Sequence, residues 1–207
     1  ILDTKTYSTR NVCKGHHSYI TSIDFSIDGT KLQSTSGDYE LLFWNAENGK
    51  QIKSASSVQD VLWATWSLPF GWPVQGIFPP HSDGTDINSV SRSKLYDDSV
   101  VSNAINGTGT GSGSSSGSGS KSGSGSGSSN KSSSNVNKNT LIATGDDSKK
   151  VKIFKYPVVK ENAKFKEYKG HSEHVTNVKF SNGEKYIYST GGLDKAILQF
   201  EIKQTKK

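Results

Sequence analysis

The sequence contains no methionine and a single cysteine, Cys13, in 207 residues. One cysteine excludes an internal disulfide and a zinc site built from several cysteines, and it favours a reducing, cytosolic setting. No apolar run reaches the ~18–20 residues that a membrane-spanning helix needs, so no membrane partner is expected. No basic segment followed by an apolar one opens the chain as a secretory signal would. Because the chain starts at Ile1 and lacks methionine, we expect a processed product or a piece of a longer protein.

Arginine is scarce as well: lysine and arginine together number 25, and only Arg10 and Arg92 are arginines. With 19 acidic residues the net charge is +6. From Lys149 to the C-terminus there are 14 lysines against six acidic residues, so the positive charge is concentrated in this part of the chain. A lysine-rich excess favours loose attraction to polyanions over the bidentate recognition that arginine supports. No basic and aromatic recognition motif accompanies it, so nucleic acid is not an expected partner.

The motifs of common catalytic and cofactor sites are missing too. The sequence has no Gly-rich loop followed by lysine, no His-Glu-x-x-His and no cysteine nucleophile. The segment 113–117 matches the hydrolase nucleophile elbow by chance, since no strand precedes it. His171 and His174 would share a metal only on a helix. We therefore expect no catalytic residue, no metal and no cofactor. Six aspartates that could suggest a cation site are more typical of turns: Asp83, Asp86, Asp97, Asp98, Asp146 and Asp147.

The middle of the chain has a different composition from the rest. Residues 107–135 are almost wholly Gly, Ser, Thr and Asn. Such a segment cannot bury enough apolar surface to offset the entropy of ordering, so we expect it to be disordered. We place this low-complexity insertion at residues 94–139. Residues 1–93 would then hold a first repeat and the start of a second, and residues 140–207 the end of the second and a C-terminal repeat.

The segments on either side of the insertion repeat each other. Gly15-His16 and Gly170-His171 each precede a short strand-like run, at 20–26 and 175–181, an offset of 155 residues. In each copy an aspartate precedes an aromatic residue by six positions, and a third copy near 144–154 is opened by the insertion. Short alternating strands between Gly, Asn and Asp turns predict an all-β fold. The recurring residues are His16, Asp38 and Trp44 in the first copy and His171, Asp194 and Phe200 in the last.

This repeat resembles the WD40 repeat, which forms one four-stranded blade of a β-propeller. The resemblance implies a WD40 β-propeller fragment of about three four-stranded blades. In such a blade the recurring residues are structural, because a chain of hydrogen bonds that ends on the Trp44 indole ties neighbouring strands together. The few residues that follow Phe200 are polar, so we expect the last blade to borrow its outer strand from a segment upstream of Ile1. Three blades cannot close a propeller, and we expect the isolated chain to be unstable or prone to associate.

Short segments extend the resemblance to the echinoderm microtubule-associated protein-like family: Ser36–Trp44, Ser82–Asn88, Ile153–Pro157 and Ser189–Asp194. Ordinary WD40 repeats have no reason to carry Ser82–Asn88, so it is the most diagnostic. The resemblance implies a non-catalytic scaffold that associates with microtubules or tubulin, in the cytoplasm and cytoskeleton. The alternative is a generic WD40 adaptor for protein–protein interaction in another complex.

Two groups of residues are candidates for partner binding. Tubulin is strongly acidic, so lysines of the C-terminal part are candidate contacts, although they could also serve only to keep the surface soluble. Trp63, Trp66 and Trp72 lie close together in the sequence. We interpret Trp63 and Trp66 as a core between blades and the proline-rich part around Trp72 as shaping a long connection, with a partner-binding surface as the alternative. The candidate lysines are Lys160, Lys164, Lys166 and Lys169.

Overall fold

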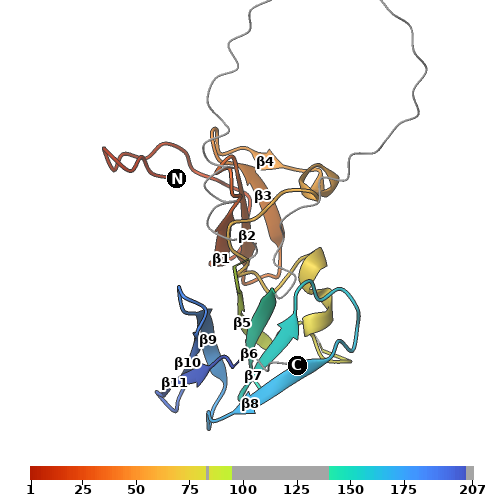
Figure 1. The fold of residues 1–207 in the computed structure, drawn as a ribbon. Helices are drawn as coiled ribbons and strands as arrows, with labels where there is room; N and C mark the ends of the chain where they lie inside the picture. The colour runs from red at the N-terminus through yellow and green to blue at the C-terminus, as the bar shows by residue number, and fades with distance from the viewer. Residues whose placement is uncertain (83, 95–139, 204–207) are drawn as a thin grey trace, which may run out of the picture.

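The computed structural model describes residues 1–82, 84–94 and 140–203, and these residues form mostly antiparallel β-sheet (Figure 1). The all-β class expected from the sequence is confirmed. The strands form three sheets, which we call the first, second and third blade in chain order. In Figure 1 the first blade lies above the other two. The segment 94–139, expected to be disordered, lies outside the described residues except for Lys94.

The first blade contains β1 (Ile20–Phe25), β2 (Lys31–Ser36), β3 (Leu41–Asn45) and β4 (Gln51–Ile52), paired in that order. The turn between β1 and β2 carries Gly29 with a φ of 68°, which glycine adopts without steric cost. The Asp28 carboxylate accepts hydrogen bonds from the N–H and the hydroxyl of Thr30 at 3.0 and 2.9 Å. This turn brings Phe25 opposite Leu32.

The second blade is assembled from both sides of the insertion. It contains β5 (Ile87–Arg92), β6 (Leu141–Asp146), β7 (Lys150–Lys155) and β8 (Phe165–Lys169), paired in that order. The strand before the insertion therefore pairs directly with the strand after it.

The third blade contains β9 (Val175–Phe180), β10 (Tyr186–Gly191) and β11 (Ile197–Glu201), with β10 in the middle. Within the described residues no strand pairs with the outer edge of β11. In the described part of the chain, the first and second blades therefore have four strands and the third blade has three.

Apolar side chains fill the space between the blades. Trp63 and Trp66 are buried in a cluster with side chains of the second blade, and the Trp63 ring centroid lies 6.1 Å from that of Phe43 in the first. The interpretation of these two tryptophans as a core between blades is confirmed. Trp72 begins the 3-10 helix η2 (Trp72–Ile77) and is 64% exposed. A shorter 3-10 helix, η1 (Ala55–Val58), precedes the tryptophans, and no described helix is long and apolar enough to cross a membrane.

Two buried charged residues of the blades form hydrogen bonds with the long connection after β4. Asp24 of β1 accepts hydrogen bonds from the Thr65 hydroxyl at 2.5 Å and from the Ser67 N–H at 2.8 Å. Arg92 of β5 donates to the Trp63 carbonyl at 2.7 Å. Because both charges find partners on the same connection, that connection fixes the first blade against the second.

Candidate functional site

A chain of hydrogen bonds crosses the first blade from Trp44 to Asp38. The Trp44 indole N–H donates to Ser34 Oγ at 2.8 Å. The two ring nitrogens of His16 each lie 2.7 Å from a serine oxygen, Nε2 from Ser34 Oγ and Nδ1 from Ser36 Oγ. The Ser36 hydroxyl in turn donates to the Asp38 carboxylate. Since the His16 side chain is 5% exposed and Trp44 is buried, the chain ties the loop before β1 to β2 and β3.

The Asp38 carboxylate fixes the direction of the hydrogen bonds at its end of this chain. The Asp38 carboxylate accepts from Ser36, so Ser36 Oγ accepts from the histidine Nδ1–H. Ser34 Oγ accepts the indole N–H and has both a proton and a second lone pair left for the hydrogen bond to Nε2. The network therefore places a proton on Nδ1. Both nitrogens are then occupied, and the ring has none left to act as a general base.

The third blade holds a shorter form of the chain. His171 Nδ1 lies 2.9 Å from Asp194 Oδ2 and donates to it, and Nε2 lies 2.7 Å from Ser189 Oγ. Phe200, the aromatic residue at the end of this repeat, has no N–H to donate. The chain therefore ends at Ser189.

The aspartate contacts the histidine directly in the third blade because Gly191 leaves room for it. A Cβ on Gly191 would lie 1.8 Å from Asp194 Oδ1. The residue at this position of the first blade is Ser36, whose hydroxyl stands between His16 and Asp38. The spacing of the repeat did not predict this direct contact between histidine and aspartate, although glycine in place of serine at position 191 indicates it.

The second blade has no histidine at the place of His16 and His171, and it buries an ion pair instead. Asp146 is 2% exposed and Lys152 is 8% exposed, and the Lys152 Nζ lies 2.6 Å from Asp146 Oδ2. Asp146 Oδ1 accepts the Ser148 hydroxyl at 2.7 Å and the Lys150 N–H at 3.0 Å. Thr144 Oγ1, at the place of Ser34, has no hydrogen-bond partner among the described residues. Lys152 was not among the site residues predicted from the sequence; the one sign of it there is a lysine between the apolar Val151 and Ile153.

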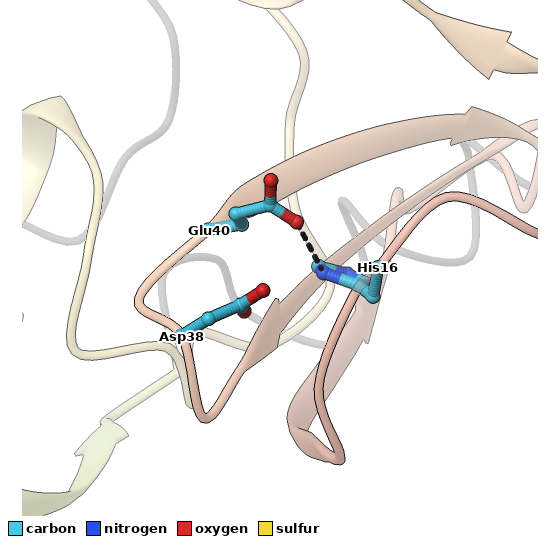
Figure 2. A group of neighbouring side chains, drawn as sticks. All are labelled: His16, Asp38 and Glu40. Carbon is cyan, nitrogen blue, oxygen red and sulfur yellow. Dashed lines mark ion pairs between the residues drawn. The ribbon is translucent and has the colours of Figure 1, made fainter.

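His16, Asp38 and Glu40 lie close enough together to suggest a metal site (Figure 2). One possible ligand atom from each lies within 4.8 Å of the others, and His16 Nδ1 is 3.6 Å from Glu40 Oε2. That nitrogen already donates to Ser36, and the exposed His17 ring is 3.4 Å from the same Glu40 carboxylate. A cation would have to break the hydrogen bonds of the blade. We therefore interpret the group as part of the structural chain.

The aspartates interpreted as turn residues have hydrogen-bond or ion-pair partners where the structure describes them. Asp86 accepts the Ser82 hydroxyl at 2.5 Å, and Asp147 accepts the Asn88 side-chain amide at 2.7 Å. Asp146 belongs to the ion pair described above. The remaining three, Asp83, Asp97 and Asp98, lie outside the described residues.

The aspartates of the hydrogen-bonded chains predict a loss of stability in acid. The Ala196 N–H, followed by His171, holds the pKa of Asp194 below its ordinary 3.8, and the Ser36 hydroxyl does the same for Asp38. A depressed pKa adds stability above the unfolded-state pKa, and that stability is lost as pH falls through the folded-state pKa. In urea titrations from pH 6 to pH 3 we expect the free energy of unfolding to fall below about pH 4. Asp194→Asn should flatten this fall, and an identical pH profile in that variant would contradict the assignment.

The four candidate lysines lie around the outer strand of the second blade. Lys160 and Lys164 lie between β7 and β8, and Lys166 and Lys169 belong to β8. All four are exposed, and no ion pair joins them to an acidic residue in the described part of the chain. Lys160, Lys164 and Lys166 line one groove between the second and third blades, whereas Lys169 does not.

Known proteins match both parts of the chain. Residues 1–107 match the family model described as the echinoderm microtubule-associated protein second beta-propeller, and residues 162–201 match the WD domain, G-beta repeat. The 77 kDa echinoderm microtubule-associated protein of Lytechinus variegatus is 38% identical over 96% of this chain and 23% of its own length. Echinoderm microtubule-associated protein-like 4 of Mus musculus is 35% identical over 96% of this chain and 16% of its own length. The chain thus spans less than a quarter of these relatives, and the resemblance to WD40 repeats is confirmed.

Proposed function

Because the chain belongs to the echinoderm microtubule-associated protein family, we propose that it is part of a non-catalytic scaffold that associates with microtubules or tubulin in the cytoplasm. The observation that carries the proposal is the family match over residues 1–107, together with relatives that are microtubule-associated by name. The histidines that could have suggested chemistry are engaged in the hydrogen-bonded chains of the blades. Binding of a protein partner is the role that such a framework supports.

The contact region that we propose is the lysine-rich surface around β8. Its exposed lysines have no acidic partner in the described part of the chain, so their charges are available to an acidic surface. Attraction of this kind raises the encounter rate and weakens with salt, because the screening length is only ~8 Å at ~0.15 M.

Reversing four of these charges should weaken microtubule binding. In the full chain with Lys160, Lys164, Lys166 and Lys169 changed to Glu, we expect co-sedimentation with microtubules at low salt to weaken about tenfold, since each exposed charge contact contributes about 0.2–1 kcal/mol. The dependence of the remaining binding on salt should also become flatter.

The matched control reverses four exposed lysines near the first blade: Lys5, Lys14, Lys50 and Lys53. This variant changes the net charge equally and should co-sediment nearly as the unchanged chain does. If the variant with the four lysines around β8 changed to Glu is folded and still binds microtubules unchanged, shape and aromatic contacts carry the affinity. Absence of co-sedimentation by the unchanged chain would favour the generic adaptor.

A further inference from the structure

A groove of about 930 Å³ runs between the second and third blades, and its lining includes Phe165, Tyr168 and Phe200, which we call its floor. Phe165 and Tyr168 of β8 line it and are 48% and 36% exposed. The Tyr168 ring centroid lies 5.7 Å from that of Phe200 in β11, so rings of both blades meet in the floor. Aromatic surface left in water at the meeting of two blades is typical of a place where another molecule binds.

Lysines also line the same groove, and we call them its walls. Five lysines line it against one glutamate, Glu201, and Glu201 lies 3.5 Å from the ammonium of one of them, Lys203. The other four have no ion pair with a described acidic residue. The groove therefore offers an apolar floor beneath uncompensated positive charge. The five lysines are Lys155, Lys160, Lys164, Lys166 and Lys203.

We propose that this groove binds an extended acidic segment of a partner protein that carries one or two aromatic or large aliphatic side chains. The apolar side chains lie on the floor formed by Phe165, Tyr168 and Phe200, and the carboxylates of the segment face the lysines. A purely acidic polymer would leave the floor in water, and a purely apolar peptide would leave the lysines without counter-charge. The inference rests on the proposed function in taking Lys160, Lys164 and Lys166 as contacts, and it adds the requirement for apolar side chains in the partner.

Two synthetic peptides separate this mode of binding from simple attraction to a polyanion. One is a labelled twelve-residue peptide of glutamate with two phenylalanines, and the other is twelve glutamates. Fluorescence anisotropy with the full chain should give an affinity at least tenfold higher for the first peptide, because it buries aromatic surface in the groove. Equal affinity of the two peptides, or equal binding of a single-stranded DNA of similar length, would overturn the proposal.

Substitution of an aromatic residue of the floor and substitution of the lysines of the walls should change the affinities for the two peptides differently. Tyr168→Ala should weaken binding of the phenylalanine-containing peptide about tenfold and leave the all-glutamate peptide nearly unchanged. The pair Lys155→Glu and Lys203→Glu leaves the floor intact and should weaken both peptides. Leu193→Ala removes an exposed apolar side chain that does not line the groove, and it should change neither affinity. A thermal melt of each variant checks that it is folded, and the lysine pair keeps the test decisive if Tyr168→Ala unfolds.

Microtubule co-sedimentation of the same variants distinguishes this inference from the proposed function. Peptide binding without co-sedimentation would support the groove and reject the microtubule scaffold. Co-sedimentation without selective peptide binding would keep the scaffold and reject the groove as its acidic-peptide site.

Discussion

Replacing Lys152 by methionine should lower the free energy of unfolding by about 3–5 kcal/mol, because it leaves the buried Asp146 carboxylate without its charged partner. The Lys152 Nζ is 2.6 Å from Asp146 Oδ2, and both residues are almost completely buried. The substitution keeps most of the side-chain volume, so the loss reports the charge more than the packing. Urea denaturation followed by circular dichroism measures it.

The matched control replaces both members of the ion pair. The corresponding positions of the first blade hold Leu42 and Ser36, so Lys152→Leu combined with Asp146→Ser reproduces an arrangement that this chain already uses. Replacing a whole buried ion pair is often neutral, and the double variant should recover most of the lost stability. If the double variant is as unstable as Lys152→Met, the unpaired charge of Asp146 is not the cause of the lost stability.

Trp44→Ala should cost about 3–5 kcal/mol, since it empties a large buried site in the middle of the first blade. The indole is closely packed: a Cβ placed on Gly15 would lie 2.9 Å from it. Trp44→Phe should cost much less, because Phe200 occupies the corresponding place in the third blade and that blade forms without the indole N–H. This variant loses mainly the hydrogen bond to Ser34, about 1 kcal/mol.

The two Trp44 variants are compared by urea denaturation under the same conditions. Equal losses in both would mean that the hydrogen bond, and not the packing, dominates at this position. No loss in either would contradict the role of Trp44 in holding β3 to β2.

The repeat allowed the strands to be predicted because the same residue types recur at the same spacing. The runs predicted at 20–26 and 175–181 end within one residue of β1 and β9. The burial of Lys152 was not predicted, because its partner Asp146 lies on the neighbouring strand and only the packing of β6 against β7 brings the two charges together. The groove could not be predicted either, since Tyr168 and Phe200 belong to different blades and only the packing of those blades brings them together.

The pairing of β5 with β6 also bears on the order in which the chain folds. β1 and β2 are separated by five residues, as are β9 and β10, whereas 48 residues separate Arg92 from Leu141. In the unfolded chain, closing the longer loop costs about 2 kcal/mol more, because closure entropy grows with the logarithm of loop length. The hairpins of the outer two blades, with their low contact order, should therefore form early, and β5 should join its sheet late. The middle blade, which packs against both of its neighbours, would then be the last of the three to form completely.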